Sequence, residues 1–301
     1  MVGTGIVNSI LDTVGGTPLV RLSRVGAPQG VDLLAKLEGA NPMGSLKERI
    51  ALEIVLAAER DGALTPDRII LESSSGNTGI GLAMVGAARG YRVTITMSER
   101  VSVERRQILK ALGAEVILTP GGSDAAWALA DEMHLREPGR YFRADQYRSP
   151  HNPGAHYSGT AAEIWSQTAG AVDALVVALG TTGTIVGAGR RLKELSPTVR
   201  VIAAQPQRGH AQQGLRNLEE SRVPEIWDPS VVDETITVAD EEAWGAAREL
   251  ARREGILGGI SSGTALHAAL VYARMNPRGT IVTVLPDRGE KYLSTSLYPA
   301  A

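Results

Sequence analysis

Short runs rich in β-branched residues alternate with helical patterns along most of this 301-residue chain. The runs predict strands at 68–72, 91–97, 115–118, 174–179, 200–205 and 280–285. Several are continuously apolar, which is typical of parallel strands covered by helices on both faces. Helical patterns lie near 47–58, 78–89, 101–112, 123–136, 155–169, 183–195, 239–254 and 262–275. This alternation predicts an α/β fold with mostly parallel sheets.

The stretch 143–153 is polar and contains proline, and it predicts a crossing between two lobes. We expect a smaller N-terminal lobe at 42–146, carrying a substrate loop, and a larger cofactor-binding lobe formed by 1–41 together with 147–301. The region 206–235 carries prolines and mixed charges and predicts irregular structure. A loop of that length inside a compact domain is usually functional or mobile.

Composition excludes several classes of function. The net charge is -2, with 31 basic and 33 acidic residues mixed throughout, which argues against a nucleic-acid partner. The chain has no cysteine, which rules out disulfides, thiolate metal sites and a cysteine nucleophile, and its five histidines show no metal-ligand spacing. No signal-peptide pattern and no apolar stretch of membrane-spanning length is visible, so we expect a cytoplasmic protein without a membrane partner.

A lysine occupies an unusual position at the start of the predicted helix in 41–58. At about 100° per residue, Lys47 falls in line with the apolar positions Ile50 and Ile54, opposite the charged side of the helix. Burial of a charged ammonium is unfavourable in free energy, so a buried lysine tends to be a neutral amine. Lysines that form Schiff bases require that neutral form. The alternative is that the side chain of Lys47 extends past its apolar neighbours to solvent.

Three predicted strand-to-helix junctions are rich in glycine and hydroxyl residues: 72–79, 180–184 and 258–264. Backbone N–H groups and hydroxyls at a helix start bind anions such as carboxylates and phosphates. Each junction alone could simply cap its helix. Together with a partly buried lysine, they meet the needs of a phosphorylated aldehyde cofactor, which requires a lysine, an anion cup and a partner for its ring nitrogen.

These motifs resemble the fold-type II pyridoxal-phosphate enzymes, which have a tryptophan synthase β-like fold, and within them the cysteine synthases of the cysteine synthase B and O-phosphoserine sulfhydrylase type. The resemblance runs over nearly the whole chain, from Gly15-Gly16-Thr17-Pro18-Leu19 to the segment Pro286-Asp287-Arg288-Gly289-Glu-Lys-Tyr292-Leu293-Ser294-Thr295. Asn41-Pro-x-Gly-Ser-x-Lys47 is similar to the family's Schiff-base segment. Ser75-Gly-Asn-Thr-Gly79 is similar to its substrate-carboxylate loop.

The resemblance implies a role for each candidate residue. Lys47 would bind pyridoxal 5'-phosphate and act as the catalytic base, Asn77 would bond the ring hydroxyl, and Ser261 would face the pyridine nitrogen. The phosphate would lie on Gly180, Thr181, Thr182, Gly183 and Thr184. The substrate carboxylate would be held by Ser74, Ser75, Thr78 and Gln146, and Arg216 would bind the phosphate of an O-phosphoserine donor. Ser74 replaces the family's usual threonine, and the segment 207–213 does not map onto the family pattern.

The implied reaction is β-replacement on O-acetyl- or O-phospho-L-serine through an aminoacrylate intermediate, with sulfide or a related sulfur donor giving L-cysteine. A homodimer is a further expectation from the family. Three alternatives stay open: a 2,3-diaminopropionate-type synthase that uses an amine nucleophile, a serine/threonine dehydratase, and a catalytically silent binding module. Intact Lys47, Asn77 and Ser261 argue against the last of these.

Overall fold

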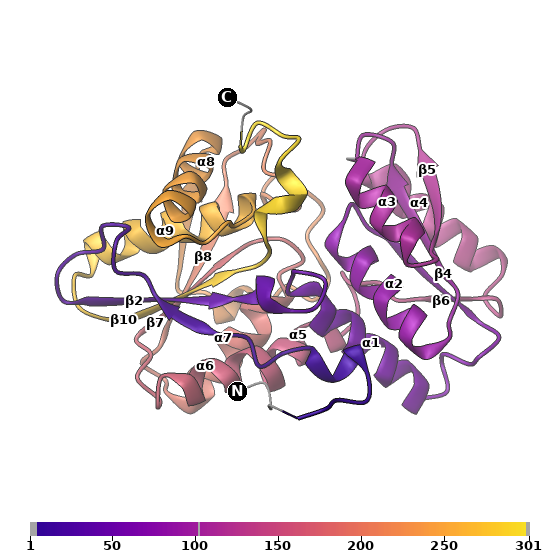
Figure 1. Cartoon of the computed structure of the whole chain (residues 1–301), viewed down its shortest axis with the longest axis horizontal. Helices are drawn as coiled ribbons and strands as arrows, with labels where there is room; N and C mark the ends of the chain where they lie inside the picture. Colours follow the sequence, from indigo (N-terminus) through magenta and orange to yellow (C-terminus); the bar gives the residue numbers. More distant parts are fainter. Residues whose placement is uncertain (1–4, 102, 299–301) are drawn as a thin grey trace. The chain divides into compact units, whose positions relative to one another are not determined.

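The computed structural model describes residues 5–101 and 103–298, and the chain divides into two compact units that we describe separately. The larger unit comprises Gly15–Leu46 and the chain from Pro153 onward (Figure 1). The smaller comprises Lys47–Asn152 and a short N-terminal stretch ending at Val14.

Both boundaries lie a few residues C-terminal to the positions expected from the sequence, 41/42 and 146/147. At the first, the Leu46 N–H donates to the Pro286 carbonyl, which keeps 42–46 with the larger unit. At the second, the Asn152 amide donates to the Gln146 carbonyl at 2.7 Å, which keeps 147–152 with the smaller unit. Local hydrogen bonds of this kind leave no signal in composition.

The larger unit is built on a sheet with strand order β1-β2-β10-β7-β8-β9. Only β1 is antiparallel to its neighbour. The strands are β1 (Leu19–Arg21), β2 (Val31–Leu37), β7 (Ala174–Ala178), β8 (Arg200–Pro206), β9 (Glu234–Val238) and β10 (Gly279–Leu285). Short 3₁₀ turns lie at Glu38–Ala40, Pro229–Val231 and Gly289–Tyr292.

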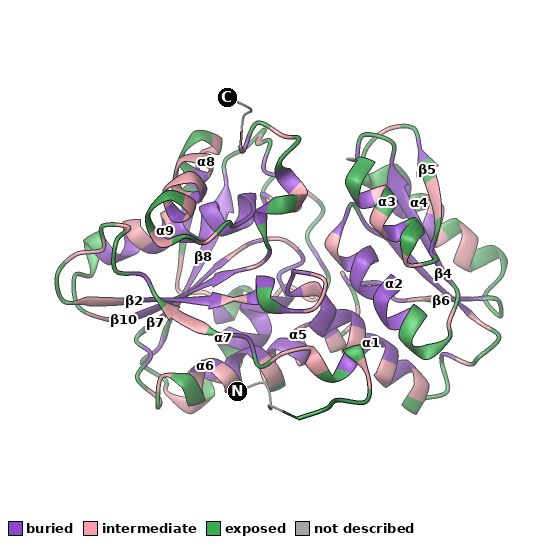
Figure 2. Cartoon of the chain, in the orientation of Figure 1, coloured by how far each residue is buried: buried purple, intermediate pink, exposed green. Residues whose placement is uncertain are grey.

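Helices cover both faces of this sheet, because successive side chains of a strand point to opposite sides. Leu175 and Val177 of β7 pack in one core cluster with residues of α6 (Ala161–Gln167) and α7 (Gly183–Leu195). Val176 packs in a second cluster with residues of α8 (Asp240–Glu249) and α9 (Ile260–Met275). Figure 2 shows the central strands buried between these helices. A doubly covered, apolar parallel sheet is the result that the strand patterns predicted.

The smaller unit has four parallel strands in the order β5-β4-β3-β6. Its strands are β3 (Ile69–Ser73), β4 (Val93–Ser98), β5 (Glu115–Thr119) and β6 (Tyr141–Arg143), and its helices are α1 (Lys47–Arg60), α2 (Asn77–Arg89), α3 (Val103–Ala111) and α4 (Ser123–Arg136). The Thr96 hydroxyl donates to the Ala126 carbonyl of α4, whereas the adjacent Ile95 lies against Gly79 of α2. Since neighbouring residues alternate in direction, α4 and α2 cover opposite faces. The 3₁₀ turn Ile10–Thr13 also contacts α2.

Both sheets contain the same reversal of strand order. In the smaller unit β3, β4 and β5 follow one another to one side, and β6 returns to the other side of β3. In the larger unit β7, β8 and β9 do the same, and β10 returns to the other side of β7. In open parallel sheets, ligands bind beyond the carboxyl ends of the strands at such a switch point. The loops after β3, β6, β7 and β10 are therefore the first places to look for a site.

Some elements differ from the sequence expectations. Four strands, β1, β2, β6 and β9, were not predicted, and the helices expected at 155–169 and 239–254 each contain a π-helical turn, at His156–Thr160 and Leu250–Glu254. A short helix, α5 (His151–Ala155), precedes the first of these turns. The strand β2 carries Asp32 and Lys36, which interrupt its apolar pattern. Lys36 is nevertheless completely buried, and its ammonium donates to the Thr17 carbonyl at 2.7 Å.

Three helices carry a glycine about one turn after their first residue, and in each case it meets a neighbouring backbone. A Cβ on Gly81 of α2 would lie 3.1 Å from the Lys47 carbonyl oxygen. On Gly187 of α7 it would lie 2.0 Å from the Pro153 oxygen, and on Gly263 of α9 it would lie 1.9 Å from the Ala243 oxygen. A larger residue at Gly187 or Gly263 would clash with the neighbouring backbone, whereas at Gly81 the neighbours would have to shift by a few tenths of an ångström.

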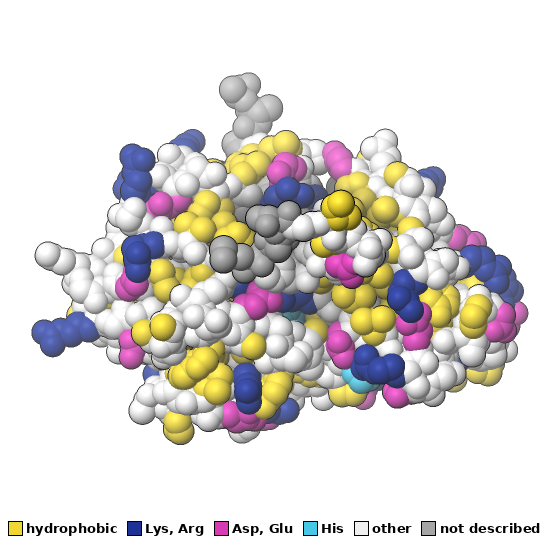
Figure 3. Space-filling model, turned by 60° about the horizontal axis from the view of Figure 1, so that its bottom comes forward, with side chains coloured by type: hydrophobic (Ala, Val, Ile, Leu, Met, Phe, Trp, Pro, Cys, Tyr) yellow, Lys and Arg dark blue, Asp and Glu magenta, His cyan; other side chains and the backbone are white. Residues whose placement is uncertain are grey.

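None of the helices in the described part of the chain is both long and apolar enough to cross a membrane. Basic and acidic side chains are interspersed on the face shown in Figure 3. This surface agrees with the balanced charge of the sequence, 31 basic against 33 acidic residues.

Candidate active site

The loop after β3 begins the smaller unit's candidate site. The Ser74 hydroxyl accepts hydrogen bonds from the N–H groups of Gly76 at 3.2 Å and Gly79 at 3.0 Å, and so folds the loop onto the start of α2. Ser74 is buried, Asn77 is half-buried as the first residue of α2, and Ser75 is exposed. An exposed hydroxyl beside the first N–H groups of a helix can bind an anion.

Gln146 joins this loop from the other side of the switch point, since it lies in the loop after β6. The Thr78 hydroxyl donates to the Gln146 side-chain oxygen at 2.6 Å, and the Gln146 side-chain nitrogen Nε2 donates to the Ser73 carbonyl at 3.4 Å. Thr78 is 3% exposed and Gln146 4% exposed. The structure thus brings together Ser74, Thr78 and Gln146, three of the four residues expected to hold the substrate carboxylate.

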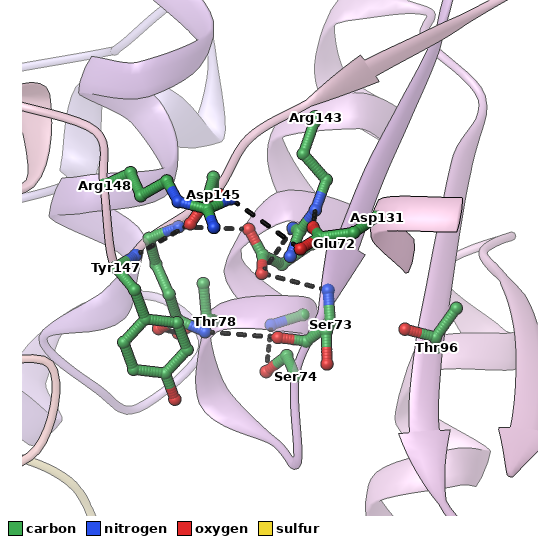
Figure 4. Close-up of polar contacts among 12 residues, drawn as sticks. Glu72, Ser73, Ser74, Thr78, Thr96, Asp131, Arg143, Asp145, Tyr147 and Arg148 are labelled. Carbon is green, nitrogen blue, oxygen red and sulfur yellow. Dashed lines mark hydrogen bonds and ion pairs between the residues drawn. The ribbon is translucent and has the colours of Figure 1, made fainter. Parts of the chain in front are cut away.

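A buried ion pair lies directly under these loops, and the sequence analysis did not find it. Arg143 of β6 lies 2.8 Å from the carboxylate of Glu72, which is completely buried in β3 (Figure 4). Burial raises the pKa of the Glu72 carboxyl, and Arg143 offsets part of that rise. Burial alone would lower the pKa of Arg143, but the Glu72 carboxylate raises it overall. The available signal was a lone glutamate ending the apolar run Ile69-Ile70-Leu71.

The Glu72 carboxylate also accepts two backbone hydrogen bonds. One comes from the Ser73 N–H at 2.9 Å and the other from the Gln146 N–H at 3.2 Å. Both backbone partners are donors, and the Arg143 guanidinium adds a positive charge 2.8 Å from the carboxylate. An ionised carboxylate is acceptor-only, so we take the pair as ionised.

Arg105 of α3 is a second residue that the sequence analysis left without a role at the loop. Its side chain is buried and donates to the Ser75 carbonyl at 3.3 Å. A Cβ on Gly76 would lie 3.2 Å from the Arg105 Nε atom. The glycine therefore allows the guanidinium to lie directly over the loop.

Lys47 is the first residue of α1, as predicted, and it is half-buried. The neighbouring Glu48 and Arg49 are 0% and 6% exposed, although the helical spacing placed them on the side opposite the apolar stripe. The first turn of α1 is therefore buried on both sides, and exposure begins further along the helix. Lys47 directly follows Leu46, the last residue of the larger unit's N-terminal segment.

The loop 180–184 links β7 to α7 at the switch point of the larger unit. Thr182 has a φ of 69° and is the N-cap of α7, and its hydroxyl is buried without a hydrogen-bond partner. Gly180 lies against the Gly214 carbonyl, 3.0 Å from where a Cβ would be. Thr181, Gly183 and Thr184 are buried. The structure thus gathers an unsatisfied hydroxyl and the first N–H groups of a 13-residue helix.

His156 supports this loop from the π-helical turn, and sequence reasoning missed it. Its ring is completely buried between two hydroxyls, with Nε2 3.1 Å from the Thr184 oxygen and Nδ1 2.9 Å from the Thr160 oxygen. Two hydroxyl partners satisfy both ring nitrogens and fix the orientation of Thr184.

Ser261 lies in the first turn of α9 and is 8% exposed. The segment after β10 runs alongside this helix start, because Gly258 bridges to Arg288 and the Ser262 hydroxyl donates to the Asp287 carbonyl at 3.3 Å. Gly259 makes the approach possible, since a Cβ there would lie 2.1 Å from an Asp287 carboxylate oxygen. Ser261 is therefore positioned next to the strand that borders β7.

Arg216 lies beside the end of β7, because its N–H donates to the Leu179 carbonyl at 2.8 Å. Its side chain is half-buried. The preceding segment 207–213 is anchored by Gln212, which donates to the Val238 carbonyl and accepts from the Thr264 hydroxyl at 2.7 Å. The segment 207–213, which had no match to the family pattern, therefore contacts the first turns of α9 at Thr264, three residues after Ser261.

The donor set of the larger unit fits pyridoxal 5'-phosphate. The buried, unpartnered Thr182 hydroxyl and the N-terminus of α7 are the groups that a phosphate requires. A neutral hydroxyl at Ser261 suits an unprotonated ring nitrogen. Among the described residues, no group of three or more His, Asp or Glu side chains could hold a metal ion.

The protein is an α/β protein with two mostly parallel sheets, and each sheet has a hydroxyl-rich helix start at its switch point. Such helix starts are suited to small anionic ligands. The model of one family, described as pyridoxal-phosphate dependent enzyme, matches residues 10–287. The chain belongs to this family, and pyridoxal 5'-phosphate is its cofactor.

Individual relatives match over nearly the full length. The chain is 42% identical over 294 residues to cysteine synthase B of Escherichia coli, covering 97% of this chain and 96% of that protein. A crystal structure of cysteine synthase from Entamoeba histolytica superposes with a TM-score of 0.94 at 42% identity, over 99% of this chain and 92% of that one. A crystal structure of O-ureido-L-serine synthase superposes with a TM-score of 0.92 at 43% identity, over 98% and 96%. The fold predicted from the sequence, a fold-type II α/β enzyme with two parallel sheets, is confirmed.

Proposed function

We propose that this protein is a cysteine synthase, which replaces the β-substituent of an O-activated L-serine with sulfide to give L-cysteine. The observation that carries the proposal is the match to cysteine synthase B, at 42% identity over 97% of the chain. When bound, pyridoxal phosphate withdraws electrons from the α-carbon of an amino acid attached to it and so permits departure of a group on the β-carbon. The chain's residues must hold substrate and cofactor and move the proton.

Lys47 is proposed as the residue that holds the cofactor aldehyde and, once released by the substrate, takes the proton from the substrate α-carbon. Its Nζ atom would return that proton after the nucleophile has added. The half-buried position at the first residue of α1 supports this role.

The loop 180–184 is proposed to bind the cofactor phosphate, with the Thr182 hydroxyl and the N–H groups of α7 as donors. Ser261 would face the ring nitrogen and Asn77 the ring hydroxyl. A serine opposite the nitrogen does not enforce its protonation, which favours loss of a β-substituent over other outcomes.

Ser74, Ser75, Thr78 and Gln146 are proposed to hold the substrate carboxylate. The support is the arrangement around α2, where Ser74 folds the loop onto the helix start and leaves Ser75 exposed. A carboxylate bound at that end would gain from the helix dipole and from hydroxyl donors.

Arg216 is proposed to bind the leaving group of O-phospho-L-serine. Its backbone is fixed next to the loop 180–184 by the bond to Leu179, and a guanidinium can bind a phosphate with two hydrogen bonds. Replacing Arg216 with Gln should raise the KM for O-phospho-L-serine more than tenfold, because a charge-assisted hydrogen bond contributes about 1.5–3 kcal/mol. The KM for O-acetyl-L-serine should change little, and equal changes for both donors would remove Arg216 from the phosphate site.

A visible absorption titration of the holoenzyme tests the reaction. O-acetyl-L-serine and O-phospho-L-serine are added separately, and sulfide follows. We expect one donor to shift the cofactor absorption and sulfide to restore it while cysteine appears. A cofactor absorption that neither donor changes would contradict the proposal.

The nucleophile is the part of the proposal with a specific alternative. A solved protein that is 43% identical to this chain is named for forming O-ureido-L-serine rather than cysteine. The same fold at this level of identity therefore serves another acceptor. Amine acceptors, including those that would give 2,3-diaminopropionate products, and thiosulfate should be tested beside sulfide. Recovery of the absorption with an amine but not with sulfide would reassign the function, and release of a keto acid would indicate a dehydratase.

We also propose that the enzyme is a homodimer in the cytoplasm. The exposed apolar side chains of Ile6, Val7 and Ile10 near the N-terminus support a contact between copies. Light scattering of the purified protein tests the dimer, and fractionation of cells that produce it tests the location. A monomer at micromolar concentration would contradict the first of these.

A further inference from the structure

The Glu72 carboxylate connects the loop after β3 to Gln146, which lies 74 residues after Glu72 in the sequence. It accepts from the Ser73 N–H, which leads into the loop after β3, and from the Gln146 N–H in the loop after β6. These loops border the switch point of the smaller sheet, where β3 and β6 are neighbours. A single buried side chain therefore spans the two edges of the proposed substrate-carboxylate site.

Gln146 is held at four atoms in this arrangement. Its N–H donates to Glu72, its carbonyl accepts from Asn152 at 2.7 Å, and its side chain bonds to Thr78 and to the Ser73 carbonyl. The other three partners are the Asn152 side chain, the Thr78 side chain and the Ser73 carbonyl. Among the four, Glu72 is the one that accepts a backbone N–H from both Ser73 and Gln146.

Arg143 fixes the orientation of the carboxylate, and a further set of ionic contacts fixes Arg143. Its guanidinium is 2.8 Å from Glu72 and donates to Asp131 of α4 at 3.2 Å (Figure 4). Asp131 also lies 3.7 Å from Arg148, which is paired with Asp145 at 2.8 Å. Asp145 has a φ of 44°, so the turn immediately before Gln146 is held in the left-handed region by these contacts.

We propose that Glu72 is a positioning residue, oriented by Arg143, that sets the geometry of the substrate-carboxylate loop through the Ser73 and Gln146 backbones. This proposal rests on the proposed function and deepens it. The geometry requires an ionised carboxylate, because an amide at this position would direct an NH₂ group at one of the two N–H donors. Glu72→Gln therefore keeps the shape and loses one of the two backbone contacts.

In the Glu72→Gln holoenzyme we expect hydrogen exchange of the Gln146 backbone N–H to be about tenfold faster or more. The reason is that hydrogen bonds to charged groups are strong, and the variant removes that charge. We expect the KM for the O-activated serine to rise about tenfold while kcat changes little, and cofactor affinity to stay unchanged. Glu132→Gln is the matched control, because Glu132 is an exposed partner of Arg136 on α4 and touches neither loop. The control should behave as the wild type in all three measurements.

The double variant Glu72→Gln/Arg143→Met separates positioning from mere structural support. Replacing a buried ion pair by neutral groups often preserves stability, whereas removing one partner leaves an uncompensated charge. We expect the thermal midpoint to recover toward the wild-type value while the KM and the fast Gln146 exchange persist. Recovery of the KM together with the thermal midpoint would overturn the proposal. The double variant also serves if the single variant does not fold.

The two proposals can fail separately. If the wild-type enzyme forms no cysteine from either donor, the proposed function fails, while the exchange of the Gln146 amide still tests Glu72, because it needs no substrate. If the wild type is active and Glu72→Gln retains both the wild-type KM and slow exchange at Gln146, the positioning role is wrong.

Discussion

The two switch points of this protein have the same strand order but differ in the kinds of residue that form them. At β3 and β6 the strands end in charge, with a buried Glu72–Arg143 pair that bonds the loops above it. At β7 and β10 the strands carry no charged residue, and the loop 180–184 is held by a helix start and a histidine–hydroxyl contact. Geometry in the first depends on ionisation, whereas in the second it depends on packing.

This difference matches the ligands that we propose for the two places. A phosphate that stays bound requires a rigid, preformed anion site. Uncharged strands packed beneath a helix N-terminus supply such a site. A substrate carboxylate enters and leaves in every catalytic cycle, and side-chain hydrogen bonds hold the loops that would receive it. Substitutions at the two switch points should therefore separate cofactor binding from substrate binding.

Replacement of Lys47 with Ala should have the largest effect, because it removes the base while leaving both switch points intact. We expect turnover to fall by about 10³-fold or more, in line with the contribution of a positioned general base. Cofactor absorption should lose its lysine-dependent band, and the thermal midpoint should stay close to the wild-type value. Normal cysteine synthesis by this variant, measured under saturating donor and sulfide, would exclude Lys47 from the chemistry.

Replacement of Thr182 with Val tests the switch point of the larger unit. The buried hydroxyl is a donor to the proposed phosphate, so cofactor affinity should fall about tenfold to a hundredfold. Equilibrium dialysis measures the affinity, and Thr198→Val is the control, because Thr198 is an exposed threonine of the same unit. At saturating cofactor the KM for the donor should be unchanged, and a raised KM would mean that the two switch points are not separable.

Replacement of Thr78 with Val tests the switch point of the smaller unit in the same way. Loss of the bond from Thr78 to Gln146 should raise the KM for the donor about fivefold, the equivalent of about 1 kcal/mol. Cofactor affinity should be unaffected. Thr94→Val is the control, because the Thr94 hydroxyl bonds Glu115 at 2.8 Å, away from both loops. If cofactor affinity falls instead, the contrast between the two switch points is wrong.

Replacement of Asp233 with Asn should have the smallest effect, since it alters a contact of the larger sheet away from its switch point. Asp233 accepts from the Val201 N–H at 2.7 Å and pairs with Lys193 at 2.9 Å. Burial alone would raise the pKa of Asp233, but these contacts lower it overall. Its stabilisation is therefore present above the ordinary value of 3.8 and is lost as the pH falls through the lowered folded pKa.

Thermal unfolding of Asp233→Asn and wild type at several pH values measures this contribution. At pH 7 we expect a loss of about 1 kcal/mol, the usual value of such a bond, and no change in the KM or in cofactor affinity. The difference between the two proteins should shrink as the pH falls from 3.8 through the lowered folded pKa, because below that pKa the wild-type carboxyl is neutral in the folded protein as well. A difference that stays constant down to pH 2 would indicate a packing effect instead.

The parallel strands at the centre of both sheets could be predicted because they are apolar on both faces. The strand β2 could not, because Asp32 and Lys36 break its pattern, and the bonds that satisfy Lys36 come from residues distant in sequence. The same limit applies to Glu72. A carboxylate at the end of an apolar strand is visible in the sequence, but its partners on β6 become known only from the pairing of the two strands.

The two lysines show where reasoning from burial fails. Lys36 is the fully buried one, and it is satisfied by the Thr17 carbonyl, the Gln167 side chain and an ion pair with Glu163 at 2.7 Å. Lys47 is only half-buried. Burial alone would select Lys36 instead of Lys47, and the motif around Lys47 is the reason for proposing Lys47. Site residues carried by local motifs could be proposed from sequence, whereas the groups that support them required the structure.

The glycines at 81, 187 and 263 have a consequence for how such an enzyme can diverge. Each glycine lets a helix that begins at a site loop pack directly against the main chain of a neighbouring segment. Because this contact involves no glycine side chain, substitutions of side chains nearby leave it unchanged. Core residues elsewhere can be exchanged over generations, and the three helix starts will keep their places. Divergence in acceptor or donor can then occur in largely exposed loops such as 207–213, while a Cβ at position 187 or 263 would require a neighbouring backbone to move.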